Sequence, residues 1–162
     1  MKHTLSILVE NHPGVLSKIS GLFSRRGFNI DSLAVGITND PNISRITIVA
    51  DGDEYVVEQL SKQLNKLIPI IKVKTLINNS FISRELCLIK VHAPANKRVE
   101  IMTVAELMQA KIIDVSTSTI TLEVTDTVDK IEILTNLLKP YGIQEVVRTG
   151  TIAIDKGSNC VQ

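Results

Sequence analysis

The fold of this chain is decided by residues 7–29, which read ILVENHPGVLSKISGLFSRRGFN. The segment starts as a β-strand, passes through a polar turn that contains Pro13-Gly14, and continues as an amphipathic helix that Gly27 ends. A turn of this kind leaves the N-terminus of the helix open at the edge of a sheet. Because the first N–H groups of a helix are unpaired and carry partial positive charge, this end can hold a carboxylate.

Residues 1–78 are predicted to form one βαββαβ unit that contains this segment. Its strands are expected at residues 4–9, 30–38, 44–50 and 70–77. The first helix starts at Gly14, and the second follows Asp51 or Asp53, either of which can cap it. Right-handed crossovers leave few topologies for this order, and the commonest is the ferredoxin-like sandwich with strand order 4-1-3-2.

Residues 79–162 repeat the same order of elements after a polar break at Asn78-Asn79-Ser80. Strands are expected at residues 85–93, 112–115, 120–124 and 143–149, and helices at residues 96–110 and 127–139. Met102 and Met108 lie at helical spacing, which indicates a place in the core. The predicted fold class is therefore α+β, with two tandem ferredoxin-like sandwiches that divide the chain into domains 1–78 and 79–162.

Composition excludes several classes of function. The net charge is +1 and only 3% of the residues are aromatic, so the chain lacks the basic field and the stacking platforms that bind nucleic acid. No apolar run is long enough to span a bilayer, and no signal sequence precedes the first strand, so we expect no membrane partner. The two cysteines and three histidines lie at no metal-ligand spacing, which predicts a reducing compartment and no metal site.

The predicted strand order places the second strand at an edge of the first sheet. An unpaired edge must be covered, and pairing with the same strand of a second copy across a two-fold axis is the simplest solution. We therefore expect a homodimer in which Asn29 and Ile30, at the start of this strand, face the first turn of the partner chain. A ligand at that turn would then lie between two subunits.

The chemistry of the turn fits a small amino acid. The N–H groups of Gly14 and Val15 would bind its carboxylate, and Gly14 has no side chain to keep the ligand from the backbone. The amide oxygens of Asn11 and of the partner's Asn29 would accept hydrogen bonds from its ammonium group, and Ile30 would line an aliphatic pocket. In the alternative interpretation, Pro13-Gly14 only starts the helix and Asn11 caps the turn locally.

A resemblance to a known family decides between these interpretations. Residues 8–33, LVENHPGVLSKISGLFSRRGFNIDSL, closely resemble the start of the small, regulatory subunit of acetolactate synthase (acetohydroxyacid synthase), an ACT-domain family. The shared pattern is an aliphatic strand, E-N, two variable residues, G-[AV]-L, a helix with G-L-F-x-R-R-G, and N-I-x-S-L. Later landmarks are Arg84-Glu85-Leu86, Ile112-Ile113-Asp114-Val115 and Arg148-Thr149-Gly150, so the resemblance covers nearly the whole chain.

This resemblance implies a non-catalytic homodimer that binds the large catalytic subunit, raises its activity, and conveys feedback inhibition by valine, often with leucine or isoleucine. The effector residues that it implies are Asn11, Gly14, Val15 and Leu16 from one subunit, Asn29 and Ile30 from the other, and His12 and Pro13 at the variable pair. This chain is expected to hold no cofactor, whereas thiamine diphosphate, magnesium and FAD are expected in the catalytic subunit. The implied location is the cytoplasm of a bacterium, or the plastid stroma if the chain is organelle-encoded.

Two other classes of function remain open on the residues alone. An acylphosphatase-like hydrolase would use the same fold, but it needs an arginine in the anion-binding loop, and residues 10–14 contain neither Arg nor Lys. A stand-alone amino-acid sensor of the ACT type would share the effector site and act on another enzyme or on a regulator. Co-purification with a thiamine-dependent enzyme discriminates between this sensor and the regulatory subunit.

Overall fold

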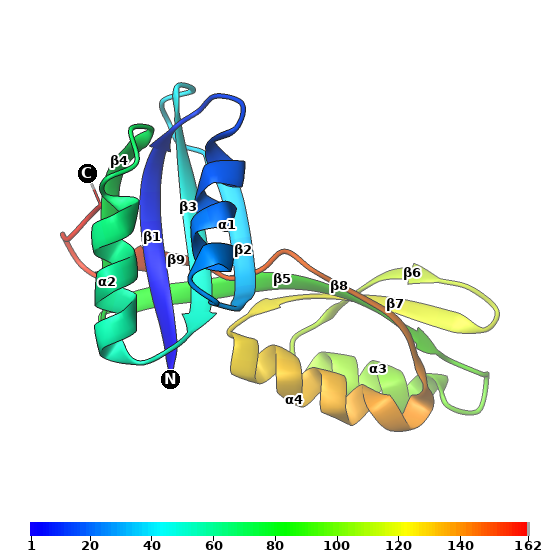
Figure 1. Cartoon of the computed structure of the whole chain (residues 1–162). Coiled ribbons are helices and arrows are strands. Elements are labelled where there is room, and N and C mark those ends of the chain that lie inside the picture. The colour runs from blue at the N-terminus through cyan, green and yellow to red at the C-terminus, as the bar shows by residue number, and fades with distance from the viewer. Residues whose placement is uncertain (162) are drawn as a thin grey trace. The chain divides into compact units, whose positions relative to one another are not determined.

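The computed structural model describes residues 1–161, which form two compact units. The first unit comprises Met1–Ile82 together with the described residues from Thr151 onward, and the second comprises Ser83–Gly150. In each unit, two helices cover one face of an antiparallel sheet (Figure 1). The predicted fold class, two tandem ferredoxin-like sandwiches, is confirmed.

The first unit contains the predicted βαββαβ order. Its elements are β1 (Lys2–Glu10), α1 (Val15–Arg25), β2 (Ile30–Ile37), β3 (Ile43–Asp51), α2 (Glu54–Leu64) and β4 (Ile70–Leu76). The strands are arranged β2-β3-β1-β4, so β2 lies at an edge, as the topology predicts. Asp53 caps α2 by accepting a 2.8 Å hydrogen bond from the N–H of Val56, which decides between the two predicted caps.

The core of the first unit lies between its helices and one face of its sheet. Alternation along β1 turns Leu5, Ile7 and Val9 toward the helices, where they pack with Ile19 and Phe23 of α1. Leu16 lies outside this core, because 41% of its surface is exposed at the N-terminal end of the helix. Val15 beside it is buried, so the first turn of α1 has one residue in the core and the next at the surface.

The second unit repeats the plan with a different core. Its elements are β5 (Phe81–His92), α3 (Arg98–Leu107), β6 (Lys111–Val115), β7 (Thr119–Asp126), α4 (Val128–Leu138), a short 3-10 helix (Lys139–Tyr141) and β8 (Ile143–Arg148). The strands are arranged β6-β7-β5-β8, the same order as in the first sheet. Cys87, Ile89 and Val91 of β5 face α3 and α4 and are fully buried.

The prediction for Met102 is wrong. Ile101 and Ala105 are the residues of α3 that are buried against the sheet, one helical turn apart. Met102 is rotated by about 100° from Ile101 around the helix axis, and half of its surface is exposed. Met108 is partly buried and packs against the core of this unit, as expected.

The C-terminal segment differs from the predicted division of the chain. Residues after Gly150 were expected in the second domain, but the strand β9 (Ile152–Asp155) belongs to the first compact unit. There the Nζ of Lys74 lies 2.7 Å from the carboxylate of Asp155, and the Nη2 of Arg45 donates to the carbonyl of Ala153 at 3.0 Å. These partners lie on the face of the first sheet that α1 and α2 leave free, and β9 also pairs with β5.

Candidate ligand-binding site

The turn between β1 and α1 is held by the neighbouring hairpin turn. The backbone N–H of Asn11 donates to the carbonyl of Asn42 at 2.8 Å, and its side-chain Nδ2 donates to the carbonyl of Pro41 at 2.9 Å. Asn11 therefore has the local structural role of the alternative interpretation. Its Nδ2 is engaged and its Oδ1 accepts no hydrogen bond from residues 1–161, so that oxygen can still serve a ligand.

Gly14 is the N-cap of α1 and has the left-handed conformation, with φ +88° and ψ −10°. A Cβ at this position would have no heavy atom within 4 Å, so the space in front of the helix end is open. No side chain of the described residues caps this end, and the first turn of α1 contains no acidic residue. The helix therefore presents unpaired N–H groups and partial positive charge to open space, as a carboxylate requires.

His12 and Pro13 form the exposed outer part of the turn. The Nε2 of His12 lies 3.1 Å from the carboxylate of Glu10, and its Nδ1 lies 3.2 Å from the carbonyl of Pro13. Both ring nitrogens thus have partners within the turn, and about half of each of the two side chains remains exposed. This pairing holds the imidazole beside the helix end without closing the space in front of Gly14.

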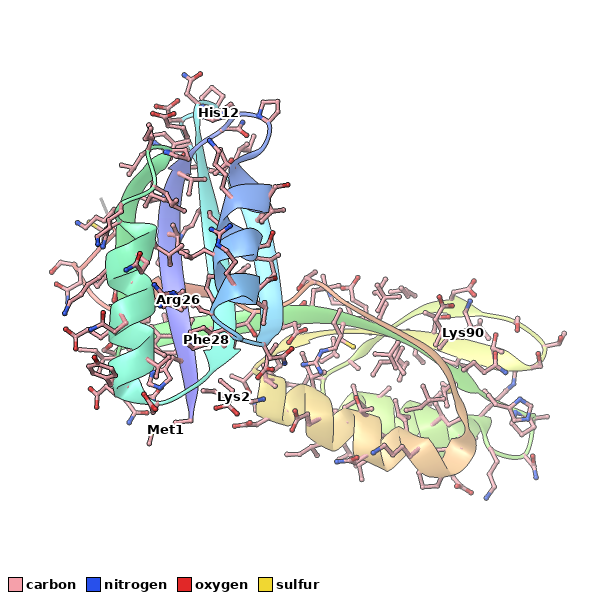
Figure 2. The ribbon with its side chains drawn as sticks, viewed as in Figure 1. Met1, Lys2, His12, Arg26, Phe28 and Lys90 are labelled. Atoms are coloured by element: carbon pink, nitrogen blue, oxygen red, sulfur yellow. The ribbon has the colours of Figure 1, made fainter. Side chains whose placement is uncertain are left out.

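The structure does not bring Asn29 and Ile30 to this turn within one chain. They follow the far end of α1, and a helix of eleven residues is about 16 Å long. Figure 2 shows His12 at one end of the first unit and Met1 and Lys2 at the other, where Phe28 also lies. The eight predicted effector residues therefore form two groups, one at each end of α1.

Around Asn29, the structure shows a residue that the sequence analysis missed. The Nδ2 of Asn29 donates a 2.9 Å hydrogen bond to Asp31, whose other carboxylate oxygen lies 3.6 Å from the ammonium of Lys2. The pairing of β2 with β3 shifts register between Ile30 and Ser32, which makes Asp31 the extra residue of a β-bulge. No sequence pattern marks this bulge, because an acidic residue at a strand start is common.

Two hollows of the first unit lie away from the turn. A depression of about 470 Å³ is bordered by Asn29, Gly27 and Asp53, so it adjoins one of the two predicted groups. A larger hollow, about 510 Å³, is lined by residues of β1, α2 and β4 that include His3, Glu58 and Thr75, and by none of the predicted effector residues. Residues 11–14 of the turn are exposed in one chain.

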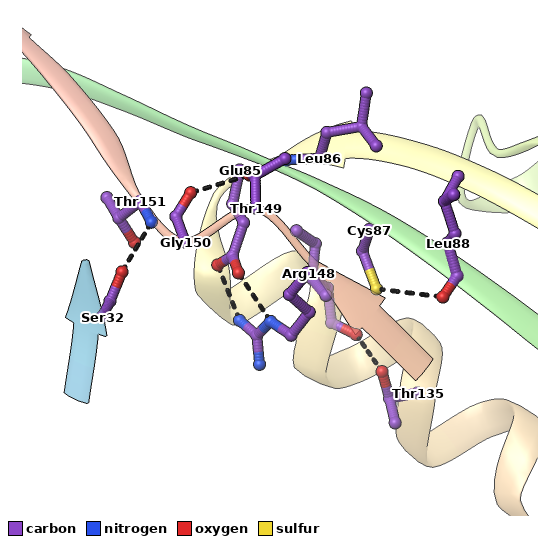
Figure 3. Close-up of polar contacts among 11 residues, drawn as sticks. Ser32, Glu85, Leu86, Cys87, Leu88, Thr135, Arg148, Thr149, Gly150 and Thr151 are labelled. Atoms are coloured by element: carbon purple, nitrogen blue, oxygen red, sulfur yellow. Dashed lines mark hydrogen bonds and ion pairs between the residues drawn. The ribbon is translucent and has the colours of Figure 1, made fainter. Parts of the chain in front are cut away.

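The second unit contains a buried ion pair at two of the predicted landmarks. Arg148 donates two hydrogen bonds, of 2.7 and 2.8 Å, to the carboxylate of Glu85, which is 4% exposed (Figure 3). The Glu85 carboxylate raises the pKa of the Arg148 guanidinium, and burial raises the pKa of the nearby Cys87 thiol. Thr149 adds a backbone hydrogen bond to Leu86, so the two strand ends are held together.

No helix in residues 1–161 is both long and apolar enough to cross a bilayer. In the same residues, no three His, Cys, Asp or Glu side chains are grouped so that they could hold a metal ion.

Similarity to known proteins covers both units. Residues 5–72 match the model of the AHAS small subunit-like ACT domain, and residues 84–157 match the model of the small subunit of acetolactate synthase. A probable acetolactate synthase small subunit of Archaeoglobus fulgidus is 52% identical over 158 residues, which are 98% of this chain and 99% of that protein. The acetolactate synthase small subunit of Mycolicibacterium smegmatis is 50% identical over 155 residues, which are 96% of this chain and 91% of that protein.

A solved structure agrees with these matches. The crystal structure of the acetolactate synthase small subunit from Thermotoga maritima superposes with a TM-score of 0.90 at 38% identity, over 98% of this chain and 99% of that one. Both halves of the chain thus match one kind of protein over its full length. The chain belongs to the family of regulatory small subunits of acetolactate synthase, with an ACT domain in its first unit.

Proposed function

We propose that two copies of this chain bind valine between them and thereby convey feedback inhibition to the catalytic subunit of acetolactate synthase, whose activity the dimer raises. One observation carries the proposal: the two groups of predicted effector residues lie at opposite ends of α1 in the same chain. A site made of both groups needs a second chain, and a site shared by two chains is suited to regulation because its occupancy alters their arrangement.

The edge strand β2 supplies a way to join the two groups. In antiparallel pairing about a two-fold axis, the start of β2 in one copy lies beside the end of β2 in the other. The end of β2 leads into the turn to which Asn11 is hydrogen-bonded. Val35 and Ile37 near this end are 50% and 67% exposed, which supports the pairing because exposed apolar edges are otherwise unfavourable.

The proposed site matches each part of an aliphatic amino acid. The carboxylate would bind the N–H groups at Gly14 and Val15. The helix end would contribute roughly 0.3–2 kcal/mol to the binding free energy. The ammonium group would donate to the Oδ1 atoms of Asn11 and of the partner's Asn29, whose Nδ2 groups already have local partners. Leu16, half-exposed beside the helix end, would contact the aliphatic side chain.

The catalytic subunit would carry out the chemistry of the enzyme. Thiamine diphosphate, magnesium and FAD would be held there, and this chain would hold no cofactor. A bacterial cytoplasm or a plastid stroma, where branched-chain amino acids are made, is the proposed location. The titration of valine against leucine and isoleucine ranks the effectors, because one methylene changes affinity by only about 1–3 kcal/mol in an apolar pocket.

Three measurements test the proposal. Light scattering gives the mass of the purified chain, calorimetry gives valine affinity and stoichiometry, and reconstitution with the catalytic subunit gives activation and inhibition. We expect a dimer, saturable valine binding, higher activity of the reconstituted enzyme, and inhibition of it by valine. A chain that binds valine but does not associate with the catalytic subunit would instead be a stand-alone sensor.

A further inference from the structure

We infer that the hydrogen bond between Ser32 and Thr151 transmits the state of the effector site to the second unit. The inference deepens the proposed function and rests on it, because it concerns how valine binding at the start of β2 produces inhibition. Ser32 follows the Asp31 bulge, and its Oγ accepts a 2.7 Å hydrogen bond from the backbone N–H of Thr151 (Figure 3). Thr151 in turn follows Gly150, the last residue of the second unit.

The first step of the transmission is the bulge. Asp31 accepts the hydrogen bond of the Asn29 side chain and is the extra residue between two register positions of β2. A bulge changes the local twist and direction of a strand without breaking the rest of the ladder. A ligand that binds the Oδ1 of Asn29 therefore acts, through one side-chain hydrogen bond, on the residue that sets the position of Ser32.

The second step is the attachment of Thr151. This residue is 5% exposed, and its N–H has the Ser32 hydroxyl as its partner. On the other side of Gly150, Thr149 exchanges hydrogen bonds with Leu86 through its N–H and its Oγ1. The chain from Thr151 into the second unit is thus short and held at both ends, so a displacement of Ser32 reaches Thr149, the residue after β8, through two peptide units.

The contact between residues 151–155 and the first sheet has features that would allow this segment to take a second arrangement. Its attachments are polar: Ser32, Arg45 and Lys74 hold Thr151, Ala153 and Asp155. Under this segment, the Oγ of Ser6 and the Nε of Arg45 are buried without a hydrogen-bond partner among residues 1–161. Buried polar groups without partners are unfavourable, so they reduce the free energy by which this arrangement is favoured over one that satisfies them.

Effector binding and effector action would depend on different residues. Ser32 lies outside the groups that would contact valine, so its hydroxyl matters for transmission and not for affinity in the free chain. In reconstituted enzyme, Ser32→Ala is expected to raise the half-inhibitory valine concentration by about 2- to 12-fold, the factor that corresponds to one neutral hydrogen bond. Ser32→Thr keeps the hydroxyl and is expected to behave like the unchanged chain.

The experiment measures three quantities for each variant: valine affinity by calorimetry, activation of the catalytic subunit, and the half-inhibitory valine concentration. Thr103→Ala, which removes an exposed hydroxyl from α3, is the matched control. If the unchanged chain neither binds valine nor conveys inhibition, the proposed function fails. If it does both and Ser32→Ala is inhibited like the unchanged chain, only the transmission through Ser32 is overturned.

Hydrogen exchange of the unchanged chain tests the inference without a substitution. Valine is expected to change the exchange rate of the Thr151 amide by more than that of the Lys90 amide, near the C-terminal end of β5. Equal exchange of Thr151 with and without saturating valine would overturn the transmission, whether or not the Ser32 variants fold. A change at Thr151 that Ser32→Thr preserves would support it.

Discussion

The carboxylate of Asp155 lies 2.7 Å from the ammonium of Lys74, 81 residues earlier in the chain. Asp155 is nearly buried, and Lys74 belongs to β4, the edge strand of the first sheet opposite β2. The pair therefore fixes the end of the chain on the first unit, after the chain has completed the second. This arrangement makes the first compact unit discontinuous in sequence.

Replacement of Lys74 by Met is expected to destabilise the protein, because the buried Asp155 carboxylate loses its partner. The loss should be roughly 2 kcal/mol, below the ~3–5 kcal/mol typical of a fully buried pair, because 34% of the Lys74 side chain is exposed. Urea unfolding measures the change. The double variant Lys74→Met/Asp155→Leu should regain most of the stability, and equal losses in the single and double variants would contradict this account.

Gly14→Asp is expected to abolish valine inhibition and to leave activation largely intact. The substitution places a negative charge where the effector carboxylate would bind and puts a side chain on a residue with φ +88°. Gly157→Asp is the matched control, because Gly157 also has positive φ and no heavy atom near its Cβ position. Loss of activation with retained inhibition in Gly14→Asp would contradict the assignment.

Asp31→Ala is expected to weaken valine binding, because the Asn29 side chain loses the hydrogen bond that orients its Oδ1. One such bond to a charged group corresponds to about 10- to 100-fold in affinity at most. Water that replaces Asp31 as the partner of Asn29 should offset part of this loss. Asp31→Asn keeps an acceptor and should bind more tightly than Asp31→Ala. Calorimetric titration of both variants measures the difference, and equal affinities would show that Asp31 does not orient Asn29.

Asp126→Asn is expected to lower stability at neutral pH and not at acid pH. The N–H of Thr127 donates to Asp126 at 2.7 Å and, with the ammonium of Lys130, holds the pKa of this carboxyl below its usual value. A folded pKa below the unfolded value of about 3.9 means that the stabilisation is present above that pH and is lost as the pH falls through the folded pKa.

Thermal unfolding between pH 7 and pH 2.5 measures this dependence. The difference between Asp126→Asn and the unchanged chain should shrink below about pH 4. Asp114→Asn, which removes the same charge from the exposed strand β6, controls for the change in net charge. A stability difference that stays constant with pH would contradict the role of the ionised carboxylate.

Most secondary structure could be predicted because its causes are local. The alternation of Leu5, Ile7 and Val9 and the helical spacing of Ile19 and Phe23 agree with the burial that the structure shows. Local patterns could not show which aspartate caps α2, or whether Met102 is buried or exposed. The first depends on which of two carboxylates reaches an N–H, and the second on which side of α3 faces the sheet.

The strand β9 shows why other features were missed. Residues 151–155, TIAID, alternate as a strand does, and alternation normally turns the isoleucines inward. In the structure Thr151, Ala153 and Asp155 are buried, whereas Ile152 and Ile154 are more than half exposed. Thr151, Ala153 and Asp155 are buried because their hydrogen-bond partners lie on the first sheet. No local pattern in these five residues indicates those partners.

The amino-acid sequence was sufficient to predict the two βαββαβ units, the edge position of β2 and the open helix end at Gly14. These features follow from apolar periodicity and turn chemistry, which act over a few residues. The tertiary structure alone decided that the chain returns to its first unit, that Asp31 holds Asn29, and that Ser32 binds Thr151. The return and the Ser32 contact join residues 81 to 119 positions apart, and the Asp31 contact depends on a bulge that only pairing with β3 creates.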